Sequence, residues 1–260
     1  MKLNNRDIVK HIIPYRGKNT STCCNLNLLD NIDKTFIMDN HLAASWCWLQ
    51  KIDPNCKYNL FHIDQHYDLS EDTLSFLENK LVESDINFIS ASIEELLCLS
   101  FKHPSLSHEN EIQILRWDNY LPILRKLYPD IINKSIFATH QEDGVDTKYI
   151  DHEFSFIDLK NELANKIREI TCNKWIVNLD IDYFFTTDQD EIIYQCFSDE
   201  YVLQITNEIK KSWESIEVLT IALSPECCGS WEKSIRIAKN ITKHLGIEWR
   251  FEDYEISSLK

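Results

Sequence analysis

Short apolar runs, many of them rich in β-branched residues, alternate with longer amphipathic stretches along the chain. The short runs predict buried strands, because each is too brief for an ordinary helix and is bounded by polar residues. The expected strands are TFIMD ending at Asp39, NLFHID ending at Asp64, INFIS near Phe88, SIFAT near Phe137, WIVNLDI ending near Asp182 and VLTIAL ending near Leu223.

The longer stretches repeat apolar residues at the spacing of one helical face. They predict helices over residues 41–50, 72–81, 93–99, 119–127, 157–170, 200–213 and 231–244. Strands that alternate with helices are typical of βα units, which build parallel sheets. Because 260 residues suit one large domain, we expect a single α/β domain over residues 1–260, with an open, mostly parallel sheet flanked by helices.

Composition and charge narrow the class of protein. Hydrophobic residues make up 43% of the chain and charged residues 27%, which is enough apolar material for a core and excludes a disordered chain. The sequence shows no signal-peptide pattern and no membrane-length apolar run, so we expect a soluble, cytoplasmic protein with no membrane partner. The net charge of -15 disfavours nucleic acid and favours cationic partners.

The nine cysteines do not predict a disulfide framework. Their number is odd, and the only tight pairs, Cys23-Cys24 and Cys227-Cys228, are adjacent residues. The C-x2-C to C-x4-C spacings that begin thiolate zinc sites are absent. We therefore expect reduced cysteines that mostly pack in the interior, so a metal site would need other ligands.

Ionisable residues follow two of the predicted strands at alternate positions. The run LFHIDQHYDLS places Asp64, His66 and Asp68 two residues apart, and WIVNLDIDYFF places Asp180 and Asp182 in the same way. Alternate residues of an extended strand share a face, so each set can converge on one side. Four carboxylates in a low-dielectric cleft would repel one another strongly, and a pair of divalent metal ions resolves that conflict.

A third strand end, in FIMDNHLAASW, adds His41 just after Asp39. A lone D-x-D is often a cap or a solvated loop, and His41 alone could be a helix N-terminal residue. The order of the three motifs favours a metal site, because ligands of open parallel sheets bind at the carboxyl ends of strands. Oxygen-rich sets with a few imidazoles suit Mn²⁺ or another hard divalent ion. The six candidate ligands are His41, Asp64, His66, Asp68, Asp180 and Asp182.

The succession DNHLAAS, HIDQHYD and NLDID resembles the metal-binding set of the ureohydrolase superfamily, which includes arginase and agmatinase and has the pattern G-D-H-S-x-A-x-G, D-A-H-x-D and D-x-D. TFIMDNHLAASWCWLQ followed by NLFHIDQHYDL resembles a divergent branch, the peptide arginases, which convert arginine to ornithine within ribosomally made peptides. The resemblance covers roughly Thr35 to Glu226. It implies an arginase/deacetylase-like three-layer α/β/α fold.

The resemblance also implies a binuclear centre with two Mn²⁺ ions per chain, whose bound hydroxide attacks a guanidinium carbon and releases urea. By similarity, Asp64 and Asp180 bridge the ions, His41 and Asp68 complete one, and His66 and Asp182 complete the other. The alternatives are a small-molecule ureohydrolase that acts on free arginine or agmatine, a deacetylase-like amidohydrolase, and a metal-stabilised protein that binds basic peptides without turnover.

The catalytic residues implied are Glu226, His140 and Asp68. Glu226 follows the last predicted strand, where ureohydrolases place a glutamate that pairs with the substrate guanidinium. His140, in the acidic loop of FATHQEDGVD, is the candidate general acid, and His103 and His108 in FKHPSLSHEN compete for that role. We expect His62 to be a core residue or a support for the ligands.

Substrate contacts are assigned to Glu226, Asp143 and Asn119, with Arg116 to Asp118 beside them at the mouth of the site. The chain departs from the family pattern at Asn40 and lacks the motif glycine, and it has no clear counterpart of the loop that reads the amino and carboxylate groups of free arginine. An arginine-containing peptide, such as a ribosomal precursor peptide, is therefore the expected partner. The sequence leaves the oligomeric state open.

Overall fold

The central sheet has eight strands, and six of them run parallel. The computed structural model describes residues 9–102, 111–141 and 147–251. In sheet order the strands are β1 (Lys10–Ile13), β2 (Leu29–Ile32), β3 (Thr35–Met38), β12 (Ile216–Ala222), β9 (Trp175–Asp180), β4 (Tyr58–Ile63), β7 (Ile132–Ala138) and β8 (His152–Glu153). Only the pairs β1–β2 and β2–β3 are antiparallel in this sheet, over the residues that the structure describes. The predicted open, mostly parallel α/β sheet is confirmed.

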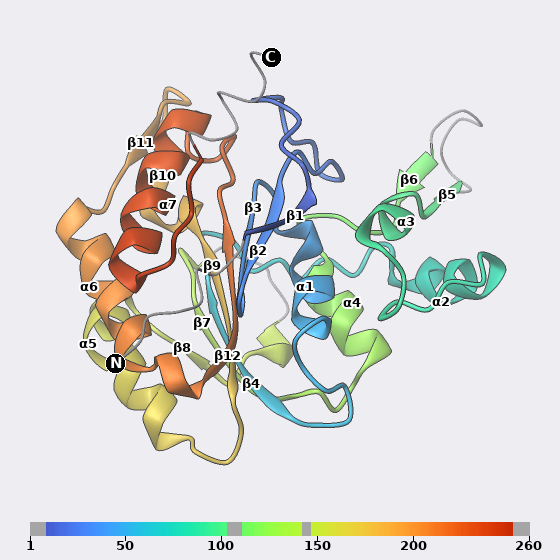
Figure 1. Cartoon of the computed structure of the whole chain (residues 1–260), viewed down its shortest axis with the longest axis horizontal. Coiled ribbons are helices and arrows are strands. Elements are labelled where there is room, and N and C mark those ends of the chain that lie inside the picture. Colours follow the sequence, from blue (N-terminus) through green and yellow to red (C-terminus); the bar gives the residue numbers. More distant parts are fainter. Residues whose placement is uncertain (1–8, 103–110, 142–146, 252–260) are drawn as a thin grey trace.

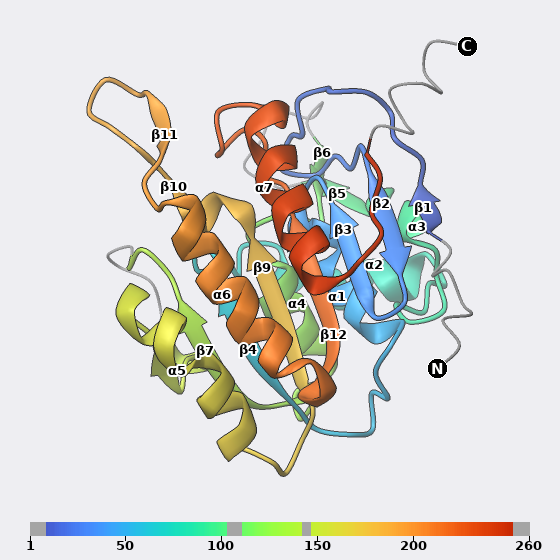
Figure 2. The ribbon, with the colours of Figure 1, turned by 60° about the vertical axis from the view of Figure 1, so that its left-hand side comes forward.

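Helices cover both faces of this sheet (Figure 1 and Figure 2). One layer holds α1 (Ala44–Leu49) and α4 (Tyr120–Leu127), and the other holds α5 (Phe156–Glu169), α6 (Asp199–Lys211) and α7 (Trp231–Leu245). Beyond the first layer, α2 (Leu74–Glu83), α3 (Ile93–Leu97) and the paired strands β5 (Ser100–Lys102) and β6 (Glu111–Gln113) extend to the side of the molecule (Figure 1). The seven predicted helices are thus confirmed to within a few residues.

Short elements follow several strands. The 3₁₀ helix η1 (His41–Ala43) precedes α1, and η3 (Ile181–Phe184) follows β9. From η3 the chain continues into the antiparallel pair β10 (Phe185–Thr187) and β11 (Ile193–Gln195). Two further 3₁₀ helices are η2 (Thr147–Tyr149) and η4 (Trp213–Ser215). The chain therefore turns tightly at the carboxyl ends of β3 and β9, where the candidate ligands begin.

The two faces of the sheet pack into separate apolar clusters. Along β4, Phe61 and Ile63 join the cluster with α5, α6 and α7, whereas Leu60 joins the cluster with α1 and α4. This alternation follows from the pleat of a strand, in which neighbouring side chains point to opposite faces. Both faces are covered, which explains why all six residues of β4 are buried.

The strand predicted at INFIS is wrong. Residues 86–90 contain no strand and residues 88–90 form a turn, although Phe88 is buried. The Asn87 side chain accepts hydrogen bonds from the backbone N–H groups of Ile89 and Ser90 at 3.1 Å each. An asparagine that binds the backbone two and three residues ahead favours a turn over a strand. The apolar run was too short for its periodicity to reveal this competition.

The strands β1 and β2 are not predicted by the sequence. Their sequences, KHII and LDNI, mix polar and apolar residues without a clear period. The fully buried Asp30 of β2 accepts hydrogen bonds from His11 Nδ1 at 2.8 Å and from Trp249 Nε1 at 2.9 Å. An aspartate in such a sequence is typical of a loop, because the partners that satisfy its buried carboxylate lie far along the chain.

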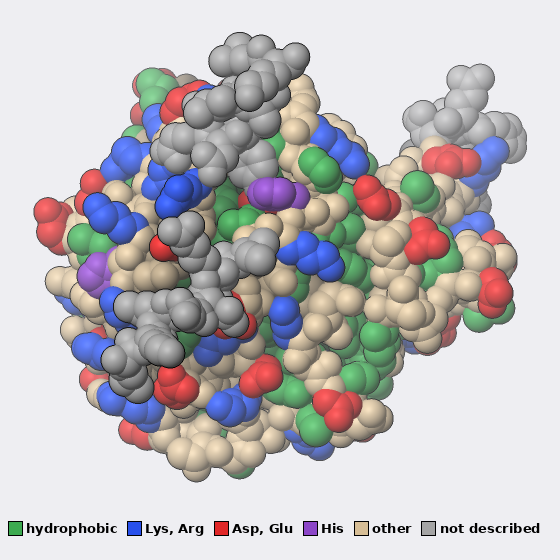
Figure 3. Space-filling model, viewed as in Figure 1, with side chains coloured by type: hydrophobic (Ala, Val, Ile, Leu, Met, Phe, Trp, Pro, Cys, Tyr) green, Lys and Arg blue, Asp and Glu red, His purple; other side chains and the backbone are tan. Residues whose placement is uncertain are grey.

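The surface gives little direct guidance to partners. Figure 3 shows Asp and Glu side chains interspersed with Lys and Arg over one face of the molecule. In the described ranges, no helix is both long enough and apolar enough to cross a membrane. All nine cysteines lie in these ranges and are unpaired.

Candidate functional site

The carboxyl ends of β3, β4 and β9 open at the same edge of the sheet and bring the six candidate ligands together. Asp180 is the last residue of β9, and Asp64 follows β4 directly. His41 begins η1, whose N-cap Asn40 accepts a hydrogen bond from the Leu42 N–H at 3.0 Å. This cap turns the chain just after β3, so the His41 side chain reaches the two aspartates on neighbouring parts of the sheet.

His41 contacts three of the carboxylates. Its Nδ1 atom lies 2.5 Å from Asp180 Oδ2 and 3.4 Å from Asp64 Oδ2, and its Nε2 atom lies 3.3 Å from Asp68 Oδ2. All four side chains are buried. His41, Asp64 and Asp180 therefore share a space small enough for a single cation, whereas Asp68 meets the other ring nitrogen of His41.

A second group forms around His66. Its Nδ1 atom lies 3.2 Å from Asp182 Oδ2 and 3.6 Å from Asp64 Oδ1. One ligand atom from each of Asp64, His66 and Asp182 falls within 4.8 Å of the others, and the same holds for His41, Asp64 and Asp180. Asp64 belongs to both groups, so the geometry has the form of two adjacent metal positions with a shared carboxylate.

Unpartnered polar atoms test whether these residues fit metal ions. The contact of His41 Nδ1 with Asp180 lacks hydrogen-bond geometry, and Asp64 Oδ2 and Asp68 Oδ2 also lack a hydrogen-bond partner among the described residues, although all three atoms are buried. Buried polar atoms are normally satisfied, and leaving several unpaired in one place is costly. Carboxylate oxygens and imidazole nitrogens are suitable ligands for Mn²⁺ and similar ions, so the residues fit a metal centre.

The backbone around the ligands directs the remaining carboxylate oxygens. Asp64 Oδ1 accepts from the His66 N–H at 2.8 Å, and Asp180 Oδ1 accepts from the Asp182 N–H at 2.9 Å. Asp182 Oδ1 accepts from the Gln65 N–H at 3.1 Å. One oxygen of each of these aspartates is therefore held by the backbone, which orients the second oxygen toward the shared space.

The pKa values reflect the crowding of buried charge without a cation. Burial, and then the charges of the neighbouring aspartates, raises the pKa of Asp64 well above its ordinary value. Burial also dominates at Asp68, whose pKa rises to about 6 although His41 and His66 oppose the shift. At His66, burial alone would lower the pKa, but hydrogen bonds and charge from Asp182 and Asp64 raise it to about 12. The cluster therefore favours bound protons or bound cations.

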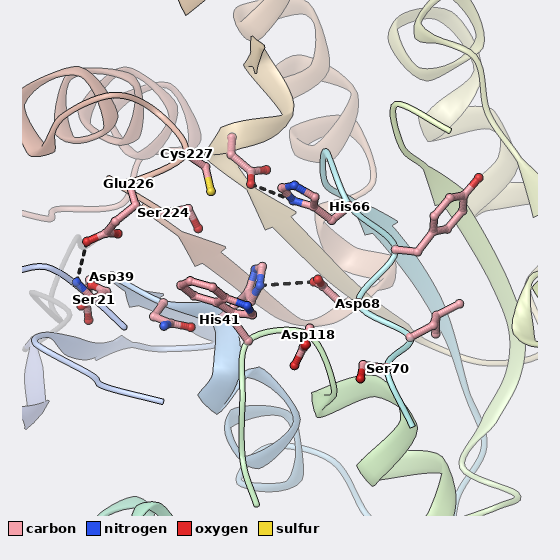
Figure 4. A pocket seen from close by; sticks show the side chains of 15 residues that line it. Ser21, Asp39, His41, His66, Asp68, Ser70, Asp118, Ser224, Glu226 and Cys227 are labelled. Carbon is pink, nitrogen blue, oxygen red and sulfur yellow. Dashed lines mark hydrogen bonds and ion pairs between the residues drawn. The ribbon is translucent and has the colours of Figure 1, made fainter. Parts of the chain in front are cut away.

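A cavity of about 450 Å³ opens over this cluster. In Figure 4, Glu226 and Ser21 lie on one side of the cavity and Asp68 and Ser70 on the other, with His41 and His66 between them. Its wall also includes residues that the sequence did not single out, namely Ser21, Tyr67, Leu69, Ser70 and Ser224. The cavity thus joins the metal cluster to the predicted guanidinium-binding residue.

Glu226 is held by a loop near the N-terminus. Its Oε1 atom accepts a hydrogen bond from the backbone N–H of Ser21 at 2.5 Å. The Ser21 hydroxyl donates in turn to Asp39 Oδ2 at 2.5 Å, and Asp39 also accepts from the N–H groups of Asn27 and Leu28 at 2.8 Å each. Asp39 therefore orders this loop and is not one of the metal groups. Residues 205 positions apart form this link, so the sequence carried no local signal for it.

His140 lies beside the site but does not line the cavity. Its Nε2 atom donates to the Tyr183 carbonyl at 2.9 Å, and its backbone N–H donates to the Gln65 carbonyl at 3.1 Å. The ring packs against the edges of Tyr183 and Phe197. In this conformation the side chain supports the loops around Asp182, and its role as general acid stays a prediction. His103 and His108 lie outside the described residues.

Asn119 is buried and fully engaged within the protein. Its Nδ2 atom donates to Thr73 Oγ1 and to the Ile114 carbonyl at 2.8 Å each, and its Oδ1 atom accepts from the Arg116 N–H at 2.9 Å. Its neighbours Trp117 and Asp118 line the cavity instead. Asn119 thus shapes the loop that presents them, and its predicted substrate contact stays untested. Asp143 lies outside the described residues.

Comparisons with known proteins give limited guidance. No protein-family model and no curated protein matches the chain. Similar solved structures include a hypothetical agmatinase from Burkholderia thailandensis (11% identity, TM-score 0.46, 80% of this chain and 56% of that chain), an Entamoeba histolytica arginase in complex with L-ornithine (16%, 0.46, 81% and 69%) and an arginase from Bacillus cereus (12%, 0.45, 83% and 70%). The chain thus spans little more than half of the agmatinase. At such low TM-scores and identities, these likenesses carry no argument about activity.

Proposed function

We propose that the protein is a metal-dependent ureohydrolase that converts arginine within a peptide to ornithine and releases urea. One observation carries this proposal: Glu226 and the cluster of His41, His66, Asp68 and Asp182 line the same cavity. A guanidinium group is cationic and planar, so it needs a carboxylate to bind it. Its resonance-stabilised carbon also needs an activated water, which a metal centre can supply.

Glu226 has the position for guanidinium binding. The Ser21 N–H holds Oε1, and no side chain of the described residues is hydrogen-bonded to Oε2, which can therefore accept from a ligand in the cavity. Burial raises the pKa of Glu226, so a cationic guanidinium gains by neutralising a carboxylate that the protein has partly removed from water. Charge-assisted hydrogen bonds of this kind orient a planar group as well as bind it.

Two Mn²⁺ ions are the proposed cofactors. His41 and Asp68 would hold one ion and His66 and Asp182 the other, with Asp64 and Asp180 between them. When bound, the ions lower the pKa of a water molecule and so supply the attacking nucleophile at neutral pH. Cleavage then separates the guanidinium carbon from the side-chain nitrogen, which leaves as the ornithine amine after it gains a proton.

Asp68 is the proposed carrier of that proton. Its carboxylate lines the cavity beside the cluster, where it would lie close to the water that the ions activate. A carboxylate in that position can accept a proton from water and pass it to a departing amine. His140 would need to release the Tyr183 carbonyl before it could serve the same role.

The lining of the cavity favours peptidyl arginine over free arginine. Among the described residues, no lysine or arginine lines it. A free amino acid would therefore bring a carboxylate close to Glu226, while the nearby guanidinium of Arg116 is already engaged by both oxygens of Asp118 at 3.0 and 3.1 Å. Such a carboxylate is unfavourable in a partly enclosed site unless that ion pair breaks. A peptide linkage removes that carboxylate. Agmatine, which also lacks a carboxylate, is the second candidate substrate.

Incubation with Mn²⁺ and a panel of substrates tests the proposal. We expect urea release and a mass change of arginine to ornithine with arginine-containing peptides, and little urea from free arginine. Turnover of agmatine alone would make the protein a small-molecule ureohydrolase, whereas deacetylation of acyl-lysine would place it in another class. Absence of turnover on every substrate, with both ions bound, would contradict the proposal and favour a metal-stabilised binding protein.

A further inference from the structure

Three polar side chains lie side by side in the core, directly beneath the metal cluster. His62 of β4 pairs with Asn178 of β9, and Asn178 pairs with Thr220 of β12. All three are fully buried and face the layer of α1 and α4, as their contacts with Trp48 and Tyr120 show. Alternation along the strands places His62 two residues before Asp64 and Asn178 two residues before Asp180. The row therefore continues the face that carries the ligands.

The hydrogen bonds of this row run from Trp48 towards His62. Trp48 Nε1 can only donate, and it donates to Thr220 Oγ1 at 3.1 Å. The Thr220 hydroxyl donates to Asn178 Oδ1 at 2.7 Å, which is a closer acceptor than the Val177 carbonyl at 3.5 Å. The Asn178 amide nitrogen then donates to Tyr120 Oη at 3.0 Å and to His62 Nδ1 at 3.2 Å. His62 Nδ1 is therefore an acceptor and carries no proton.

At the other end, His62 Nε2 lies 3.0 Å from the His66 carbonyl oxygen. A carbonyl can only accept, so Nε2 must carry the ring proton and donate it. This agrees with the acceptor role of Nδ1, and the opposite tautomer would set two lone pairs against each other at the carbonyl. The row thus selects one tautomer of a neutral imidazole.

The His66 carbonyl lies in the loop that carries the ligands Asp64, His66 and Asp68. Asp68 has a left-handed backbone conformation with φ of 55°, which an aspartate adopts only at some cost. The hydrogen bond from His62 joins strand β4 to the middle of the loop that follows it. It therefore restrains the turn between Asp64 and Asp68. An ordered hydrogen bond here holds the three side chains in place before any cation arrives.

We propose that His62 is a positioning residue for the metal-ligand loop, and that Trp48, Thr220 and Asn178 keep it in the Nε2–H tautomer that this task requires. It does not ligate metal. One ligand atom from each of His62, Asp64 and Asp68 falls within 4.8 Å of the others, which by distance alone is a third possible metal group. Both ring nitrogens of His62 are already committed, however, so no lone pair is left for a cation. The proposal rests on the metal site of the proposed function and not on the identity of the substrate.

Two substitutions at Thr220 form a matched test. Thr220→Val keeps the shape of the side chain but removes the hydroxyl that orients Asn178, whereas Thr220→Ser keeps the hydroxyl. Equilibrium dialysis against Mn²⁺ measures affinity and stoichiometry without any substrate. We expect Thr220→Val to bind the same number of ions with about tenfold lower affinity, within the range for residues that orient ligands. Thr220→Ser should bind like the native protein.

The tautomer gives a readout that general destabilisation would not change. In nitrogen-15 histidine spectra, the native protein should show His62 protonated at Nε2, and Thr220→Val should show a mixture of tautomers at temperatures where it is folded. Native affinity together with a native tautomer in Thr220→Val would overturn the proposal.

His62→Leu separates a positioning residue from a ligand. We expect this variant to bind the native number of ions with lower affinity, because no ligand is removed. Loss of one ion per chain would make His62 a ligand and overturn the proposal. If His62→Leu does not fold, the Thr220 pair decides. A protein that passes these metal tests but turns over no guanidine would refute the proposed function and leave this inference intact.

Discussion

Two rows of side chains cross the same three central strands at neighbouring levels and differ completely in chemistry. Phe61, Val177 and Leu219 face α5, α6 and α7, and all three are apolar. One residue further along each strand, His62, Asn178 and Thr220 face α1 and α4, and all three are polar. Apolar burial stabilises without fixing direction, whereas buried polar groups must each meet a matching partner. At this level of the sheet, one row therefore contributes apolar burial and the other contributes oriented hydrogen bonds, although both faces carry an apolar cluster.

The largest expected effect comes from the ligand at the end of the polar face. Asp180→Ala removes a carboxylate that lies 2.5 Å from His41 Nδ1, so we expect loss of metal and of all measurable turnover. Metal analysis and urea release check this result. Asp130→Ala, at an exposed carboxylate 3.9 Å from Lys57, is the control and should change neither. A variant at Asp180 that keeps both ions and its activity would refute the assignment of the site.

A substitution in the apolar row should lower the stability of the fold and leave metal affinity unchanged. Phe61 is fully buried and its ring lies against Phe154 and Trp175, so Phe61→Ala should lower the free energy of unfolding by about 3–5 kcal/mol. Denaturant unfolding measures this loss, and dialysis should show unchanged Mn²⁺ affinity in the folded fraction. A loss of Mn²⁺ affinity as large as that expected for Thr220→Val would contradict this prediction. It would show that the two rows do not act independently.

Glu226 belongs to neither row. Its substitution should weaken the binding and turnover of substrate without changing the metal content. Glu226→Gln removes the charge that pairs with a guanidinium, which is worth about 1.5–3 kcal/mol. We expect kcat/KM to fall by about 10- to 100-fold with metal content unchanged. Glu94→Gln, at an exposed carboxylate 3.8 Å from Arg16, is the matched control. An unchanged kcat/KM at Glu226→Gln would remove the residue from the substrate site.

The smallest expected effect is a pH trend in the metal-free protein. Asp68 has a folded-state pKa of about 6 against an ordinary value of 3.8, and His66 has one of about 12 against 6.5. A raised folded-state pKa gives stability that is present at low pH and is lost as pH rises, so both groups act in the same direction. We expect the melting temperature of chelator-treated protein to fall between pH 5 and pH 9.

Bound Mn²⁺ should remove that trend. Metal takes the place of the protons, and its affinity rises as the ligands lose them, so the difference in melting temperature between the loaded and the metal-free protein should widen with pH. Thermal unfolding at several pH values measures both curves. A metal-free protein that becomes more stable over this range would show that the cluster does not hold these protons.

Much of the architecture could be predicted from the local pattern of apolar and polar residues. Five of the six parallel strands, namely β3, β4, β7, β9 and β12, and the seven predicted helices follow from apolar period, whereas the two-residue strand β8 was not predicted. The prediction failed at INFIS, where Asn87 forms a turn through its own side chain, and at β1 and β2, where distant partners satisfy Asp30. Apolar periodicity predicts which helices and strands are buried. It gives no signal where a side-chain hydrogen bond favours a turn over a strand.

The candidate site also has a part that the sequence predicts and a part that it does not. The sequence by itself determined which residues converge at the candidate metal cluster, because alternation along a strand delivers Asp64 with its neighbours and Asp180 with Asp182 to one edge of a parallel sheet. Only the tertiary structure decided how those groups are held. The Ser21 N–H that orients Glu226 and the Thr220 hydroxyl that orients Asn178 lie 205 and 42 residues from their partners. Hydrogen-bond direction depends on atoms brought together by folding, and no local pattern in the chain encodes it.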